Sequence, residues 1–126
     1  MVGFHTNIEE ATLTNENFRK VLFTGEHSQL VVMSLLPNEK IDMEVHPNVD
    51  QFFRFEKGEV KAELNGEIVH LKENDVLIVP AGTFHEITNT SSTQPLKLYT
   101  VYSPANHPAG TVHATKADAE AAEAKE

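Results

Sequence analysis

Two short stretches decide the fold of this chain: Glu44-Val45-His46-Pro47-Asn48-Val49-Asp50-Gln51, with Gly58 seven residues later, and Pro80-Ala81-Gly82-Thr83-Phe84-His85, with Asn89 after it. They carry imidazole, carboxylate and amide groups, which are ligands for divalent transition metals. Side chains two apart on a strand share a face, so we expect Glu44 and His46 to project together. Gln51 opens the next strand, and His85 comes from a separate one. The two stretches therefore predict a metal site made by Glu44, His46, Gln51 and His85.

Outside these stretches, short apolar runs alternate with turn residues. Asn65-Gly66, between two such runs, is the strongest short hairpin signal in the chain. The expected strands cover residues 18–24, 29–36, 41–46, 51–55, 60–64, 67–71, 76–79, 85–89 and 96–102. Roughly ten short strands at this spacing are typical of a closed antiparallel barrel or jelly roll. We therefore predict an all-β fold.

The chain is long enough for a single domain with one core, at 126 residues. We predict an N-terminal arm over residues 1–17, the barrel over 18–103, and a C-terminal segment over 104–126. Within that segment, residues 114–126 are rich in Ala and Glu and predict a solvated terminal helix.

Composition excludes several classes of protein. The formal charge of −9 argues against nucleic acid and anionic membranes as partners. Because the chain has no cysteine, it has no thiolate ligand and no disulfide. No apolar run approaches the roughly 20 residues of a membrane span. The first residues lack the basic and apolar regions of a signal peptide. These features favour a cytoplasmic protein.

The second stretch resembles one of the two conserved boxes of the cupins. It matches that box at Pro80, Gly82, His85 and Asn89, with Asn74 in place of the leading glycine. Asparagine tolerates a positive φ, so we expect the turn to be unharmed. The resemblance extends over roughly residues 18–102. It implies the cupin double-stranded β-helix, a jelly-roll barrel, with a short C-terminal helical tail.

The first stretch resembles the other cupin box at His46 and Gly58. It departs from that box because Glu44 replaces its first histidine and Gln51 replaces its glutamate; the leading glycine is also missing. The stretch is similar to the Gln-x-His-Pro motif of phosphomannose isomerases, which are cupins whose zinc ligands are Gln, His, Glu and His. Here Gln and Glu have exchanged places, so the charge of the site is unchanged. This implies one divalent ion: Zn, Mn, Fe or Ni.

Several functions are compatible with such a site. The first is a metal-dependent isomerase or lyase acting on a small sugar or hydroxy-carbonyl substrate. The second is an Fe(II) dioxygenase, because two histidines and one carboxylate with open positions suit that chemistry. The third is a non-enzymatic cupin that binds a metal or small ligand. A metal-free cupin, with Glu44 and Gln51 used only for hydrogen bonds, would have to bury two histidines at a cost. Small cupins usually pair, so the resemblance also implies a homodimer.

Two further sets of residues are weaker candidates. His107-Pro108-Ala109-Gly110-Thr111-Val112-His113 either folds over the barrel mouth as a lid or packs against a neighbouring subunit, and we favour the second use. Asp50 is a candidate for proton transfer near the metal. The only arginines are Arg19 and Arg54, and neither lies in a box where it obviously reaches the cavity, which argues against a sugar phosphate as substrate.

Overall fold

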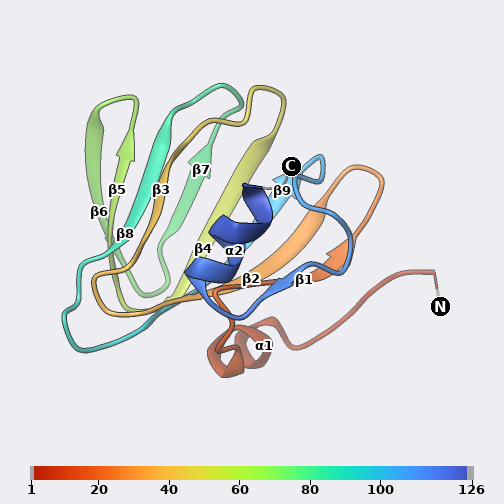
Figure 1. The fold of residues 1–126 in the computed structure, drawn as a ribbon, viewed down its shortest axis with the longest axis horizontal. Coiled ribbons are helices and arrows are strands. Elements are labelled where there is room, and N and C mark those ends of the chain that lie inside the picture. Colours follow the sequence, from red (N-terminus) through yellow and green to blue (C-terminus); the bar gives the residue numbers. More distant parts are fainter. Residues whose placement is uncertain (1, 125–126) are drawn as a thin grey trace.

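The computed structural model describes residues 2–124, which form a small barrel of strands with one helix near each end of the chain (Figure 1). The elements, in chain order, are α1 (Ile8–Thr14), β1 (Arg19–Thr24), β2 (Gln29–Leu35), β3 (Lys40–Glu44), β4 (Asp50–Lys57), β5 (Glu59–Leu64), β6 (Glu67–Lys72), β7 (Val76–Val79), β8 (His85–Asn89), β9 (Leu96–Ser103), β10 (Val112–His113) and α2 (Lys116–Glu123).

The strands form two antiparallel sheets, as predicted for a jelly roll. The larger sheet has the order β10-β1-β2-β9-β4-β7, and the smaller has the order β3-β8-β5-β6. Alternate residues of each strand point into the space between the sheets. That space is filled by the apolar core, to which the larger sheet contributes Met33, Phe53 and Leu98, and the smaller contributes Ala62 and Ile87. The all-β prediction is confirmed.

The turns follow from local chemistry. Asn65 and Gly66 both have positive φ, at 48° and 86°, which is the backbone of the tight turn that joins twisted strands such as β5 and β6. Asn74 has φ of 74°, so it adopts the conformation that a glycine would provide at this position. Both predictions from the sequence are confirmed.

The strand predicted over residues 41–46 is wrong at its end. β3 stops at Glu44, and His46 lies in the loop that leads to β4. Pro47 has no amide hydrogen and restricts the residue before it, so the ladder with β8 cannot continue. The loop is held instead by Gly82, whose amide donates to the carbonyl of His46 at 2.9 Å.

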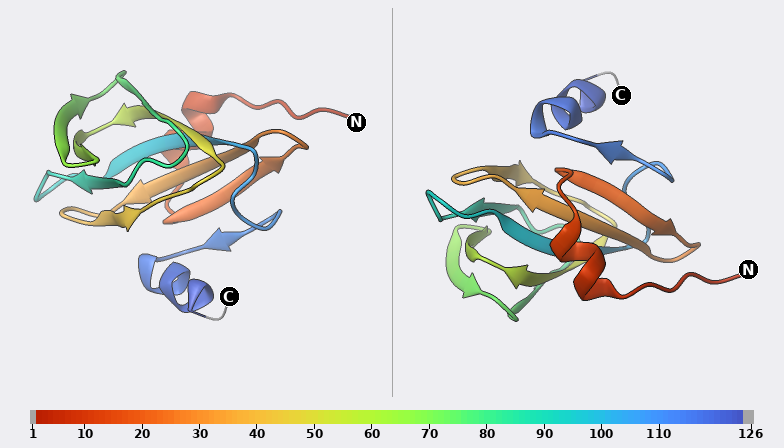
Figure 2. Two further views of the ribbon diagram at one scale, coloured as in Figure 1. Left: turned by 90° about the horizontal axis from the view of Figure 1, so that it is seen from above. Right: turned by 90° about the horizontal axis from the view of Figure 1, so that it is seen from below.

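The two helices lie on opposite sides of the larger sheet (Figure 2). α1, which the sequence did not predict, begins after Asn7, whose side chain accepts a hydrogen bond from the amide of Glu10. α2 is shorter than expected, and its description as solvated is wrong on one face, because Ala119 is 2% exposed and belongs to the core. Residues 125 and 126 of the predicted helix lie outside the described residues. β10, which pairs with β1, was also missed.

Among the described residues, neither helix has the length and apolar character that a membrane crossing requires.

Candidate metal centre

Glu44, His46 and His85 converge at one end of the space between the sheets. Glu44 is the last residue of β3 and His85 is the first of β8, and the two are paired across the antiparallel ladder. His46 reaches them from the loop after β3. One ligand atom from each of the three side chains lies within 4.8 Å of the other two. The convergence expected from the sequence is therefore present, although the loop rather than the strand positions His46.

The carboxylate of Glu44 stands between the two imidazoles. Its Oε1 is 3.2 Å from His46 Nε2 and 3.4 Å from His85 Nε2. The other ring nitrogen of His85, Nδ1, donates to the carbonyl of Thr83 at 2.9 Å, which fixes the ring and leaves Nε2 with its lone pair toward the site. His85 is 1% exposed, and within residues 2–124 its Nε2 has no hydrogen-bond partner.

Gln51 lies on the inner face of β4, also 1% exposed. Its Nε2 donates to Thr100 Oγ1 at 3.0 Å, which fixes the orientation of the amide. Its Oε1 is buried and has no hydrogen-bond partner among the described residues. An oriented amide with a free oxygen is suited to act as a neutral donor to a hard or borderline cation.

Contacts within the cluster shift the pKa of Glu44 and the pKa of His85. Burial alone would raise the pKa of Glu44, but contact with His46 and His85 outweighs it and lowers that pKa to about 2. Burial alone would lower the pKa of His85, but the Glu44 carboxylate and the Thr83 carbonyl outweigh it and raise that pKa above 6.5. The site therefore holds a Glu44 carboxylate that stays ionised and a His85 imidazole that binds a proton more readily than a free histidine does.

The donor set fits a divalent transition metal. Nitrogen and oxygen ligands at about 2.0–2.2 Å from such an ion lie about 3–4 Å from one another, which is close to the separations seen between Glu44 and the two histidines. Two imidazoles and one carboxylate suit Zn, Mn, Fe or Ni. The two buried atoms without partners, His85 Nε2 and Gln51 Oε1, would both be satisfied by an ion.

Tyr102 and His107 form a hydrogen-bonded pair beside this cluster. Tyr102 is the cross-strand neighbour of Gln51, and its ring meets the edge of His46 at 5.9 Å between centroids. Its hydroxyl is 3.2 Å from His107 Nε2. Burial raises the pKa of Tyr102, whereas burial and the charge of Arg19 lower the pKa of His107 to about 4. At neutral pH the pair therefore joins a hydroxyl donor to a neutral imidazole acceptor.

The segment that carries His107 folds back over the barrel. Gln29, buried on β2, accepts from the amides of residues 106 and 107 through Oε1 and donates to the carbonyl of His107 through Nε2 at 2.7 Å. Further along, the amide of Val21 donates to the carbonyl of Thr111 at 2.8 Å. The arrangement is compatible with the lid that the sequence offered as one use of this segment, and packing against a neighbouring subunit, the use that we favoured, stays a prediction.

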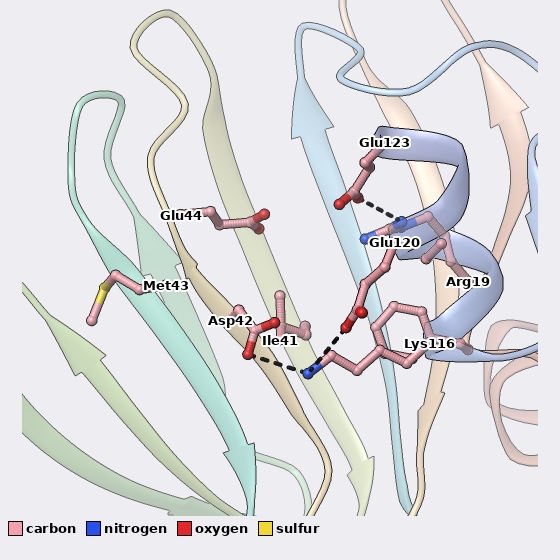
Figure 3. Close-up of a pocket in the computed structure, with 10 residues that line it drawn as sticks. Arg19, Ile41, Asp42, Met43, Glu44, Lys116, Glu120 and Glu123 are labelled. Carbon is pink, nitrogen blue, oxygen red and sulfur yellow. Dashed lines mark hydrogen bonds and ion pairs between the residues drawn. The ribbon is translucent and has the colours of Figure 1, made fainter. Parts of the chain in front are cut away.

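Arg19 was overlooked as a site residue because it lies outside both boxes. The structure places it on the inner face of β1, where it lines a pocket of about 170 Å³ together with Glu44 (Figure 3). The alternation of the first strand could have revealed it, since Arg19 shares a face with the buried Val21. Arg54 lies on the outer face of β4 and donates to Asn74.

Asp50 has a structural contact that the sequence did not suggest. Its exposed carboxylate accepts a hydrogen bond at 2.8 Å from the amide of Ala81, in the turn that precedes β8. This contact ties the start of β4 to the turn before His85. The role of Asp50 in proton transfer stays a prediction.

Comparison with known proteins decides the family. A family model for the cupin domain matches residues 31–102. The chain belongs to the cupin family. It is 49% identical to an uncharacterized protein, YrkC, from Bacillus subtilis (strain 168), over 95% of this chain and 67% of that protein. It is also 49% identical to an uncharacterized protein, L612, of Acanthamoeba polyphaga mimivirus, over 84% and 68%. The crystal structure of BH2720 from Bacillus halodurans superposes with a TM-score of 0.91 at 41% identity, covering 94% of this cupin and 93% of that chain.

Two of the cupin box residues are structural rather than chemical. Gly58 has φ of 113°, and a Cβ there would lie 3.2 Å from the Cα of Leu96 and from the carbonyl of Pro95. Asn89 is buried and donates through Nδ2 to the carbonyls of Leu35, Leu36 and Gln94. The boxes of this cupin therefore combine candidate ligands with residues that hold its strands and loops in place.

Proposed function

We propose that this cupin binds one divalent transition metal ion through Glu44, His46 and His85, with the amide oxygen of Gln51 as a fourth donor. The observation that carries the proposal is the state of His85. Its Nδ1 is held by the carbonyl of Thr83, while its buried Nε2 faces a carboxylate and makes no hydrogen bond within residues 2–124. An imidazole oriented in this way is typical of a metal ligand.

A metal-free cupin is supported less well. The hydrogen bond between His46 and Glu44 would compensate part of the burial of this site. His85 Nε2 would have only the Glu44 carboxylate, at 3.4 Å, and the buried Gln51 Oε1 would have no partner among the described residues, which costs about 1–3 kcal/mol for such an atom. A cation in the site would give both atoms a partner.

We further propose an isomerase or lyase acting on a small sugar or hydroxy-carbonyl compound. A bound divalent ion supplies Lewis acidity toward a carbonyl or hydroxyl oxygen. The protein itself would supply proton transfer through Tyr102 and His107, since the Tyr102 hydroxyl lies beside His46 and is already bonded to a neutral imidazole. Gln29 would keep His107 in position for this role.

Metal analysis tests the proposal directly. We expect protein purified without a histidine tag to contain close to one transition metal ion per chain by mass spectrometry of the elements. Zinc or nickel would favour the isomerase or lyase, because neither metal activates oxygen readily; iron would favour the dioxygenase alternative. Metal-free protein that also fails to bind Zn, Mn, Fe or Ni at micromolar concentrations would contradict the proposal.

The affinity for Zn²⁺ is expected to fall in acid. Metal binding requires neutral imidazole, and the pKa of His85 is raised above 6.5, so protons displace the ion as the pH falls through that pKa. Glu44, with a pKa of about 2, stays ionised throughout. Competition with a chelating dye between about pH 7.5 and pH 5.5 should show a loss of about tenfold or more.

Thermal unfolding of the metal-free protein provides the control, because its pH dependence has the opposite sign. A raised pKa in the folded state means that the contact of protonated His85 with Glu44 stabilises the fold below pH 6.5 and is lost as the pH rises. A Zn²⁺ affinity that does not change over this range would contradict the assignment of His85 as a ligand.

A further inference from the structure

Arg19 is a buried cation with incomplete hydrogen bonding. It is 3% exposed, and its Nη1 makes two long contacts, at 3.3 Å to His113 Nδ1 and at 3.4 Å to Glu123 Oε1. Its Nε has no hydrogen-bond partner among the described residues. Because a guanidinium has five donors and cannot lose its charge, this arrangement leaves capacity for an anionic acceptor.

The pocket next to Arg19 shares Glu44 with the proposed metal site. Arg19 and Glu123 line one side of it, and the carboxylate of Glu44 points into it from the opposite side, on β3 (Figure 3). The other cation that lines the pocket, Lys116, already contacts Asp42 at 3.2 Å and Glu120 at 3.9 Å. Arg19 is therefore the lining cation with the most capacity for a ligand.

The charge of the pocket limits what that ligand can be. Its lining contains two cationic and four carboxylate side chains, a net charge of −2 that a bound divalent ion would cancel. A doubly charged phosphate would be repelled by the four carboxylates and would find only one available arginine. A ligand carboxylate carries a single negative charge and matches the planar geometry of one guanidinium group.

We propose that Arg19 binds the carboxylate of a small hydroxy or oxo acid, and that Glu123 occupies Arg19 when no ligand is bound. This rests on the proposed function and names its substrate class, since the hydroxyl or carbonyl of the same acid would face Glu44 and the histidines. Glu123 is suited to the exchange because its side chain is 52% exposed and its contact with Arg19 is long. An incoming carboxylate would replace it at Nη1.

A purely structural role for Arg19, as the anchor of α2, predicts the opposite effect of Glu123 on ligand binding. If Glu123 only anchors the helix, removing its charge should loosen α2 and leave ligand binding unchanged or weaker. If Glu123 competes with the ligand, removing its charge should strengthen binding. The substitution Glu123→Gln separates the two, and Glu120→Gln is the matched control, because Glu120 lies on the same helix and contacts Lys116 instead of Arg19.

The test uses lactate and its neutral isostere lactamide as probes, titrated by calorimetry into the zinc-loaded protein. We expect saturable binding of lactate, about tenfold or more tighter than binding of lactamide, and loss of that difference in Arg19→Gln. Glu123→Gln should tighten lactate binding several-fold, and Glu120→Gln should change it less. If Arg19→Gln does not fold, the result for Glu123→Gln decides.

Four outcomes would overturn the inference: no saturable binding of lactate, equal binding of acid and amide, equal binding in Arg19→Gln, or weaker binding in Glu123→Gln. Tighter binding of inorganic phosphate than of lactate would overturn the assignment to a carboxylate. Repeating the titration with chelator-treated protein separates the two proposals. A preference for the acid that persists without metal supports the Arg19 site even if the protein is found to bind no metal.

Discussion

Zn²⁺ affinity should fall by about a hundredfold or more when His85 is replaced by alanine. Removing a residue that only hydrogen-bonds to a metal ligand already lowers metal affinity by about ten- to a hundredfold, and loss of the ligand itself should cost at least as much. His85 is the most firmly held member of the cluster, through its Nδ1 bond to Thr83. We expect the same loss for His46→Ala, since each variant leaves one histidine and one carboxylate. Competition titration with a zinc chelator at neutral pH would measure the change.

Gln51→Ala should give a smaller loss, about tenfold, because a neutral amide oxygen binds a divalent ion less strongly than an imidazole or carboxylate. His70→Ala is the matched control, since His70 is an exposed histidine on β6 outside the cluster. Circular dichroism should show that every variant keeps the barrel. Full metal occupancy in both His46→Ala and His85→Ala would refute the ligand assignment.

Asn89→Ala should lower the free energy of unfolding by about 2–4 kcal/mol, the range expected when a buried hydrogen-bond network is broken. The Asn89 amide donates to three backbone carbonyls, and its Oδ1 accepts from the amide of Ser91 at 3.0 Å. These bonds tie the end of β2 to the loop before β9. Alanine would leave the buried carbonyl of Leu35 and the partly buried groups of the adjoining loops without this partner.

Urea denaturation would measure this change, and Asn48→Ala provides the control. Asn48 is exposed, so its replacement should change the free energy of unfolding by less than about 0.5 kcal/mol. Zn²⁺ affinity should be unchanged in folded Asn89→Ala, because Asn89 is not in the cluster. If the variant were fully stable but bound Zn²⁺ weakly, Asn89 would have to be counted with the metal site.

The sequence predicted the barrel well because its signals are local. Alternation of period two, the Asn65-Gly66 turn and the positive φ of Asn74 each depend on a few neighbouring residues. The same locality explains two errors. α1 is short and its pattern is weak, and the end of β3 is decided by the loss of pairing with β8 at Pro47. The homodimer and the cytoplasmic location stay predictions.

The sequence by itself determined the cupin barrel and nominated Glu44, His46, Gln51 and His85, because box spacing and strand alternation place residues on a face without reference to the rest of the chain. Only the tertiary structure placed Arg19, Tyr102 and His107 around that cluster. Arg19 meets Glu123 across 104 residues of sequence, and His107 is held by Gln29 across 78. Contacts over such separations depend on which strands pair and where the last segment returns, and no local pattern encodes either.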